Sequence, residues 1–210
     1  MKQIAIIGAG NVGSALARAW ANAGHRVLIG TRDTTQPDLQ SLSSQKGISL
    51  HTHQDAAAAA EAILFSIPAA VMPTLVPTLG NLSGKVLIDA TNSIREKPHP
   101  YANGFEALKA LAPQSLVVKC FNSTGFENME HPISETKYGS IALDMFMAGS
   151  SLAAKQVAES LATDAGFEAC YDFGGDDKVE LLEHFAMAWI NLAIMQKQGR
   201  SIGFKVLKRR

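Results

Sequence analysis

A glycine pattern near the start of the chain limits its fold more than any other feature. The pattern follows a short apolar run, Ile4 to Ile7, and opens a stretch in which apolar residues recur every three or four positions. It reads Gly8, Ala9, Gly10, Asn11, Val12 and Gly13. A strand, a glycine turn and a helix in this order begin the βαβ unit that binds a dinucleotide. The sequence therefore predicts a Rossmann fold.

The three glycines have different roles in such a loop. Gly8 permits the tight turn, and Gly10 lets the backbone approach a pyrophosphate. Gly13 lets the helix pack closely against the strand. The backbone N–H groups of Asn11, Val12 and Gly13 then point at the phosphates, where the positive end of the helix dipole adds to them. We expect the whole loop, residues 8–13, to bind the cofactor.

The rest of the chain repeats the alternation of strand and helix. Six apolar runs lie between helical patterns, at Ile4–Ile7, Val27–Gly30, Ile48–Thr52, Ala62–Ile67, Val86–Ala90 and Leu116–Phe121. Nearly continuous apolar strands are typical of a parallel sheet with helices on both faces. Two more runs, Ser140–Ala148 and Phe167–Phe173, extend the sheet. We predict an α/β fold with a doubly wound, mostly parallel sheet of about eight strands.

A long helix is predicted to close the chain, from about Asp176 to Gln198. It is apolar nearly all round between Phe185 and Met195, so it must be buried on more than one side. We therefore expect residues 1–175 to form the nucleotide-binding domain. Residues 176–210 form a C-terminal helix and tail that pack on this domain and join two copies in a homodimer.

The end of the second strand indicates which dinucleotide binds. An acidic residue there would accept hydrogen bonds from the ribose of NAD. Thr31 occupies that position and Arg32 follows, and a hydroxyl beside a guanidinium suits the 2′-phosphate of NADP. Asp33 lies one residue further on and resembles a turn carboxylate more than a ribose ligand. The sequence favours NADP(H).

Two further strand ends should line the dinucleotide, because ligands of open α/β sheets lie outside the carboxyl ends of the strands. The residues concerned are Ser66, Ile67, Pro68, Thr91 and Asn92. The apolar pair Ile67 and Pro68 suits the nicotinamide ring, and the hydroxyls of Ser66 and Thr91 suit ribose or phosphate. Ordinary strand-end turns remain the alternative.

The composition argues against several classes of partner. Lys+Arg and Asp+Glu both number 19, which gives no basic surface for nucleic acid or for a membrane. The longest nearly apolar run, Phe185 to Met195, is far shorter than the roughly 20 residues that cross a bilayer. Cys120 and Cys170 lie in apolar strands and suit reduced thiols in the cytoplasm. No signal peptide, catalytic nucleophile or metal-ligand pattern is recognised.

Several residues of the last quarter of the chain are given structural roles. His184 is expected to be a satisfied, partly buried side chain, and Met187 and Met195 are expected to fill the core. The basic tail, with Lys205, Lys208, Arg209 and Arg210, is expected to be a frayed and solvated terminus.

The chain resembles the NADPH-dependent reductases of the deazaflavin coenzyme F420, and the wider class of NADP-binding oxidoreductases around them. The matching segments are Ile6–Gly13, Gly30–Arg32, Ser66–Pro68, Asp89–Asn92 and Val118–Ser123. The stretch from Asp172 to Trp189 is similar to the family's terminal helix, which in that group joins the dimer and helps to wall the substrate cleft. The nucleotide domain is also similar to the cytosolic part of membrane ferric reductases.

The resemblance implies hydride transfer between the nicotinamide and a small-molecule acceptor, a deazaflavin or flavin-like ring. Such chemistry depends on positioning and exclusion of water, and it requires no nucleophile or metal. Asn122 and Ser123, at the end of the sixth strand, are the candidates for binding the acceptor, with a role in stabilising the turn as the alternative.

Two other functions are compatible with the sequence. Reduction of an imine or another small organic substrate uses a similar Rossmann domain with a longer helical domain. A module that binds NADP(H) without turnover and signals through its dimer is the second alternative.

Overall fold

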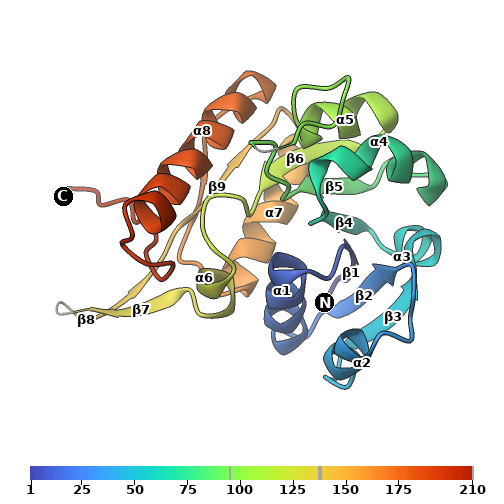
Figure 1. The fold of residues 1–210 in the computed structure, drawn as a ribbon, viewed down its shortest axis with the longest axis horizontal. Helices are drawn as coiled ribbons and strands as arrows, with labels where there is room; N and C mark the ends of the chain where they lie inside the picture. The colour runs from blue at the N-terminus through green and yellow to red at the C-terminus, as the bar shows by residue number, and fades with distance from the viewer. Residues whose placement is uncertain (95, 137–138, 210) are drawn as a thin grey trace.

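The protein is described by a computed structural model over residues 1–94, 96–136 and 139–209 (Figure 1). A sheet of eight strands, in the order β10-β9-β6-β5-β4-β1-β2-β3, runs through its centre. The strands are β1 (Gln3–Ile7), β2 (Arg26–Thr31), β3 (Ile48–Thr52), β4 (Ala62–Phe65), β5 (Val86–Asp89), β6 (Leu116–Cys120), β9 (Met145–Ala148) and β10 (Cys170–Asp172). β6 and β9 pair antiparallel, and the other neighbours pair in parallel. The predicted fold class is confirmed.

The order of the strands reverses at β1, which lies between β2 and β4. Ile4 of β1 is in register with Val27 on one side and with Ala62 on the other. The glycine loop therefore leaves the sheet at its switch point, beside the loop that follows β4. In open α/β sheets this crevice is where ligands bind.

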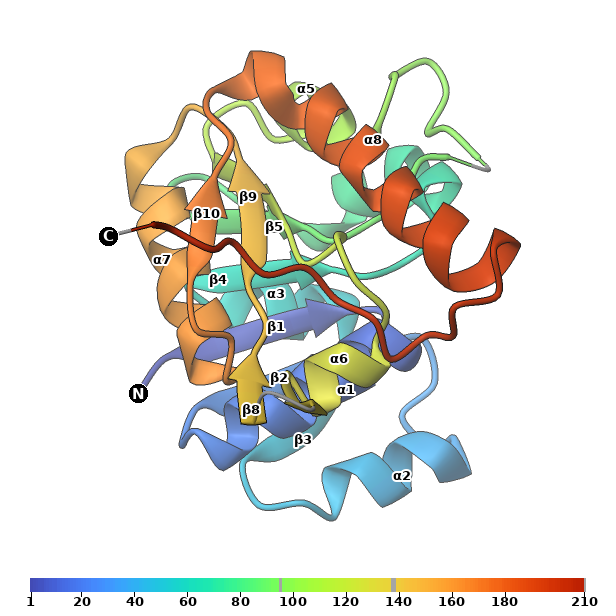
Figure 2. The same cartoon turned by 90° about the vertical axis from the view of Figure 1, so that its left-hand side faces the viewer.

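Helices cover both faces of the sheet (Figures 1 and 2). One core contains side chains of α1 (Asn11–Asn22), α2 (Pro37–Ser43), α6 (Glu127–Glu130) and α7 (Leu152–Asp164). The other contains side chains of α3 (His53–Ala59), α4 (Met72–Leu75), α5 (Gly104–Leu111) and α8 (Val179–Ile190). Among the described residues, no helix has the length and hydropathy needed to cross a bilayer.

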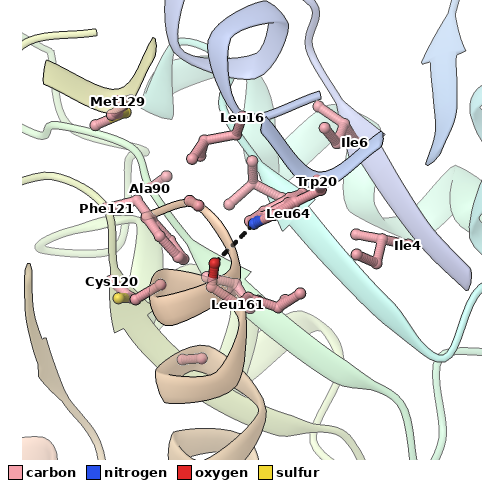
Figure 3. Close-up of a cluster of buried hydrophobic side chains, with 14 of the residues drawn as sticks. Ile4, Ile6, Leu16, Trp20, Leu64, Ala90, Cys120, Phe121, Met129 and Leu161 are labelled. Atoms are coloured by element: carbon pink, nitrogen blue, oxygen red, sulfur yellow. Dashed lines mark hydrogen bonds between the residues drawn. The ribbon is translucent and has the colours of Figure 1, made fainter. Parts of the chain in front are cut away.

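The packing of α1 follows from its sequence. Apolar residues three and four positions apart place Leu16 and Trp20 on the face that meets the sheet, and both are fully buried. Figure 3 shows Trp20 at the centre of this cluster, where its Nε1 donates a hydrogen bond of 2.8 Å to the carbonyl oxygen of Leu161 in α7. Its ring meets that of Phe121 edge-on, with centroids 5.7 Å apart. The loop-bearing helix is thus fixed to both the sheet and α7.

The predicted strand Ser140–Ala148 is wrong in one respect, because it consists of two strands. β8 (Gly139–Ala142) pairs with β7 (Ile133–Thr136) in a separate hairpin, and only β9 enters the main sheet. Figure 1 shows this hairpin extending away from the sheet. The break falls at Asp144, whose buried carboxylate accepts hydrogen bonds from Lys205 Nζ and from the Val206 backbone N–H.

The same contacts correct the prediction of a solvated basic tail. Lys205 also forms an ion pair of 2.9 Å with Glu168, and the ring centroids of Phe204 and Phe185 lie 4.4 Å apart. Lys208 stands over the ring of Tyr171. The tail is therefore docked along β9 and α8 as far as Val206. Lys208 and Arg209 are exposed, as predicted, and Arg210 lies outside the described residues. The basic charges of the tail alone predict a solvated terminus, because the acidic partners of Lys205, Asp144 and Glu168, lie far from it in the sequence.

Two predicted helices are divided into shorter pieces. Residues 69–79, where Pro73 and Pro77 interrupt the pattern, form the turns η1 (Ala69–Val71), α4 and η2 (Val76–Leu79). The terminal helix is divided into η3 (Asp176–Lys178), α8 and a π-helical turn, η4 (Asn191–Met195). Cys120 and Cys170 are buried free thiols, with their Sγ atoms 3.8 Å apart.

Candidate functional site

The glycine loop joins β1 to α1 with different space around each glycine. Gly8 has a positive φ of 104°, which favours glycine. A Cβ atom on Gly13 would lie 2.0 Å from the carbonyl oxygen of Gly8, so helix and loop touch there. A Cβ atom on Gly10 would meet nothing within 4 Å. The loop therefore packs tightly against the protein at Gly8 and Gly13, and space remains beside Gly10.

The N-terminus of α1 is free to bind an anion. Gly10 is its N-cap, and within the described residues of this helix there is no side-chain cap and no acidic residue in the first turn. The first N–H groups of a helix need acceptors from outside it, and the helix dipole favours a negative charge there. These features suit a pyrophosphate.

The loop after β4 supports the glycine loop. The Ser66 hydroxyl donates a 2.5 Å hydrogen bond to the carbonyl oxygen of Gly8, so this group is engaged in the protein. Ile67 is half-buried and lies 2.6 Å from the position of a Cβ on Gly8. Pro68 is exposed. Ile67 and Pro68 thus remain as an apolar surface beside the loop.

The residues after β2 agree with the prediction for Asp33. Its Oδ1 accepts hydrogen bonds from the Thr35 hydroxyl at 2.6 Å and from the Thr35 backbone N–H at 2.8 Å. These bonds hold the pKa of Asp33 below its ordinary value. Asp33 is thus a turn carboxylate. The Thr31 hydroxyl belongs to the same turn, because it donates to the Asp33 carbonyl oxygen and accepts from the Asp33 backbone N–H, each at 3.2 Å. Arg32 is exposed and remains for a ligand. His53 lies close by: burial lowers its pKa, and the charge of Arg32 lowers it further.

A cavity of about 500 Å³, here called cavity A, lies between the glycine loop and the terminal segment. Its lining includes Asn11, Val12, Ala90, Asn92, Phe121, Asn122, Trp189 and Arg200. It therefore collects residues from the carboxyl ends of β1, β5 and β6. The predicted residue Thr91 lies behind this wall, with a buried hydroxyl that has no hydrogen-bond partner among the described residues.

Asn122 is the most distinctive residue of cavity A. It is only 9% exposed, yet neither its Oδ1 nor its Nδ2 has a hydrogen-bond partner in the described part of the chain. Phe121 before it adopts a left-handed conformation with φ of 64°, which turns the chain at the end of β6. Burying an unpaired amide costs stability, so a hydrogen-bond partner for Asn122 would have to come from outside the described residues.

The structure separates the two residues predicted to bind the acceptor. Ser123 is 1% exposed, and its hydroxyl faces the Met145 sulfur at 3.4 Å. It belongs to the core behind the cavity, whereas Asn122 lines the cavity.

The far wall of cavity A comes from the terminal segment, which the family resemblance implied, although no sequence pattern indicated Trp189 or Arg200 themselves. Trp189 Nε1 donates a 2.7 Å hydrogen bond to the carbonyl oxygen of Ile202. The Arg200 guanidinium lies 5.5 Å from the ring centroids of both Phe126 and Trp189, and it pairs with Glu127. The Arg200 guanidinium and the rings of Phe126 and Trp189 thus line cavity A together with the residues from the ends of the sheet strands.

Three expectations for α8 and η4 are wrong. His184 is exposed, and it lines a second cavity described below. Met195 is 60% exposed, and Met187 lines both cavities. The apolar pattern of α8 and η4 predicts that the helix is buried on all sides, but one side of it faces these cavities.

A buried ion cluster connects the sheet to α8. Lys119 Nζ lies 2.9 Å from Asp89 Oδ2, 2.7 Å from the Thr91 carbonyl oxygen and 2.8 Å from Glu183 Oε1. Burial alone would lower the pKa of Lys119, but Asp89 and Glu183 outweigh it and hold that pKa above its ordinary value. Among the described residues, no group of three or more His, Cys, Asp or Glu side chains is placed to hold a metal ion.

Comparison with known proteins agrees with this geometry. Residues 3–93 match the family model described as NADP oxidoreductase, coenzyme F420-dependent. The F420-dependent NADP reductase of Methanothermobacter thermautotrophicus is 28% identical over 225 aligned positions, which cover 98% of this chain and 94% of that protein. A crystal structure from Arthrobacter sp. FB24, assigned as an F420-dependent NADP-reductase, superposes with a TM-score of 0.84 at 25% identity, covering 99% and 100% of the two chains.

The metalloreductase STEAP2 of mouse is also similar, with 31% identity over 119 residues. The match covers 57% of this chain but only 24% of STEAP2. This chain therefore corresponds to about a quarter of that protein. The resemblance predicted from the sequence is confirmed.

Proposed function

We propose that this chain, an NADP-dependent oxidoreductase similar to the F420-dependent reductases, transfers a hydride between nicotinamide and a deazaflavin or flavin-like acceptor. The observation that carries the proposal is the unpaired amide of Asn122 in cavity A, next to an open glycine loop. A flat ring with carbonyl and ring-nitrogen groups would supply partners for this amide.

The residues of the loop and the strand ends fit NADP(H). The glycine loop, residues 8–13, would hold the pyrophosphate at the N-terminus of α1, where Gly10 leaves space for it. Thr31 and Arg32 would hold the 2′-phosphate. The nicotinamide half would lie along the ends of β4 and β5, against Ile67, Pro68 and Asn92, whereas Thr91 is buried behind this surface. Ser66 supports the loop through its bond to Gly8.

When bound, NADPH supplies the hydride, and the protein supplies the geometry. Hydride moves directly from carbon to carbon, so the rate depends on how closely the two rings are held and how well water is excluded. Asn122 would orient the acceptor through its amide. The wall of Trp189 and Arg200 would close cavity A against water.

The choice of cofactor gives the first prediction. Replacing Arg32 by Ala should weaken NADPH binding by about tenfold to a hundredfold, because charge-assisted hydrogen bonds to the 2′-phosphate are lost. NADH binding should hardly change. Fluorescence titration of both dinucleotides measures the two affinities. Equal losses for NADPH and NADH would contradict the assignment of Arg32 to the phosphate.

The hydride acceptor is tested by mixing the purified protein with NADPH and oxidised deazaflavin, and following the loss of NADPH absorbance. Free flavin and a cyclic imine are run in parallel. Oxidation that depends on deazaflavin supports the proposal, and oxidation only with the imine would favour an imine reductase. Tight NADPH binding with no acceptor would favour a sensing module.

The same assay tests Asn122. The variant Asn122→Leu should fold, because it removes two buried atoms that lack partners. It should lower kcat/KM for the acceptor by about tenfold or more while NADPH affinity stays near wild type. Asn81→Leu, at an exposed turn, is the matched control. If both variants reduce the acceptor at the wild-type rate, Asn122 has no role in binding it.

We also propose a homodimer in the cytoplasm. The outer side of α8 and η4 exposes Leu181, Leu192 and Met195, each at least 40% accessible, and a second copy would cover this apolar stripe. Free buried thiols are typical of a reducing compartment. Sedimentation equilibrium measures the mass in solution, and a monomer at micromolar concentration would exclude the dimer.

A further inference from the structure

We infer that a second cavity, here called cavity B, is a binding site for an organic ammonium ion. Cavity B is a groove of about 880 Å³ between α5 and α8, which is large enough for a small organic molecule. It adjoins cavity A, because Ile94 and Met187 line both. Figure 2 shows α8 running past α5, with the loop that precedes α5 nearby. Nothing in the proposed hydride transfer uses this groove.

The first observation is the charge of the lining. Among the described residues, cavity B has five carboxylate side chains and two lysines. Three of the carboxylates have cationic partners: Asp176 pairs with Lys109, Asp177 with Lys178, and Glu183 with Lys119. Within the ranges that the structure describes, Glu106 and Glu180 form no ion pair, and Lys97 is the lining lysine that pairs with none of the carboxylates. Glu106 accepts a hydrogen bond from the Ala102 backbone N–H. The groove therefore has an excess of negative charge and attracts cations.

The second observation is independent and lies deeper, at Glu183. This residue lines the groove, is 8% exposed, and belongs to the buried cluster with Lys119 and Asp89. Its Oε1 forms an ion pair with Lys119 Nζ at 2.8 Å. Its Oε2 is buried and has no partner among the described residues.

The cluster cannot satisfy Glu183 from within. An ammonium group has three donors, and those of Lys119 face Asp89, the Thr91 carbonyl oxygen and Glu183 Oε1. Two carboxylates and one ammonium leave one negative charge in excess, and a buried charge without compensation is costly. Oε2 is shielded from solvent in this structure. A small rotation of the Glu183 side chain would bring it to the groove, where a cation that donates to Oε2 would remove both deficits.

The walls indicate that this cation is organic. The described part of the chain has no cluster of three metal-binding side chains. Tyr101, Phe105 and Met187 give the groove apolar surface for a carbon skeleton. Aromatic faces also attract cations, as Lys109 shows by standing 6.0 Å from the Phe105 ring centroid. An amine with an apolar body matches both parts of the groove.

The test uses the full chain and three probes of nearly equal shape: 2-phenylethylamine, 2-phenylethanol and phenylacetate. Binding is measured by ligand-observed NMR and by calorimetry, without dinucleotide. We expect the amine to bind at least tenfold more tightly than the alcohol, and the carboxylate not to bind. Equal affinity of amine and alcohol, or no binding of the amine at millimolar concentration, would overturn the proposal.

Two variants locate the site. Glu183→Gln should weaken amine binding at least tenfold, and Glu159→Gln, at an exposed position of α7, should not change it. Ala102→Trp should block the groove without altering its charge, and it keeps the test valid if Glu183→Gln does not fold. NADPH titration of each variant checks that the fold and the dinucleotide site are intact. Weaker amine binding at unchanged NADPH affinity assigns the loss to cavity B. Unchanged amine binding in both variants would place the amine elsewhere and refute the site.

Discussion

Gly13→Ala should lower the free energy of unfolding by about 3 kcal/mol or more and weaken NADPH binding at least about a hundredfold. The added Cβ would lie 2.0 Å from the Gly8 carbonyl oxygen and 2.7 Å from the Ser66 hydroxyl. A contact with backbone cannot be relieved by rotating a side chain, so helix α1 must move away from the loop. Chemical denaturation and fluorescence titration measure the two effects.

Gly10→Ala is the matched control, because it makes the same chemical change three residues earlier. Its Cβ would meet no atom within 4 Å, and Gly10 has an ordinary φ of −70°. Stability should therefore change by less than about 1 kcal/mol. NADPH binding should still weaken, because the methyl group enters the space of the pyrophosphate. Full NADPH affinity in Gly10→Ala would mean that the phosphates do not lie at this loop.

Lys119→Met should destabilise the protein by about 3–5 kcal/mol. The substitution keeps the apolar length of the side chain but leaves Asp89 and Glu183 buried without their cation. Breaking a buried pair on one side costs more than the pair contributes, because the remaining charge is not solvated. The midpoint of urea unfolding, compared at constant m-value, measures the loss.

Two further variants check the cause of this loss. Arg18→Met breaks an exposed pair with Glu130 and should cost less than about 1 kcal/mol. Adding Asp89→Asn and Glu183→Gln to Lys119→Met removes the isolated charges and should restore part of the stability. If Lys119→Met costs no more than Arg18→Met, the cluster does not stabilise the fold.

The parts of the molecule that the sequence predicted are those that local patterns determine. The glycine loop, the strand before it and the helix after it form one continuous segment, so spacing alone identified them. Alternation of apolar runs likewise predicted the sheet. Asp33 was recognised as a turn residue because its bonds to Thr35 lie within two positions.

The parts that were missed depend on contacts between distant segments. Asp89, Lys119 and Glu183 meet only after β5, β6 and α8 have packed together. One signal was present, since Lys119 interrupts an otherwise apolar strand and a buried lysine needs an acidic partner. No sequence pattern indicates which acid pairs with Lys119. The contact of Arg200 with Trp189 depends in the same way on the path of the tail.

The docked tail has a consequence for how such proteins diversify. Cavity A has one wall from the ends of the sheet strands and another from Trp189 and Arg200, which the terminal segment contributes. Exchanging residues 176–209 between relatives would therefore alter this second wall and leave the glycine loop and Arg32 untouched. If cavity A binds the acceptor and Arg32 the 2′-phosphate, as we propose, preference for a new acceptor and preference for a new dinucleotide would be inherited separately, each through its own stretch of the gene.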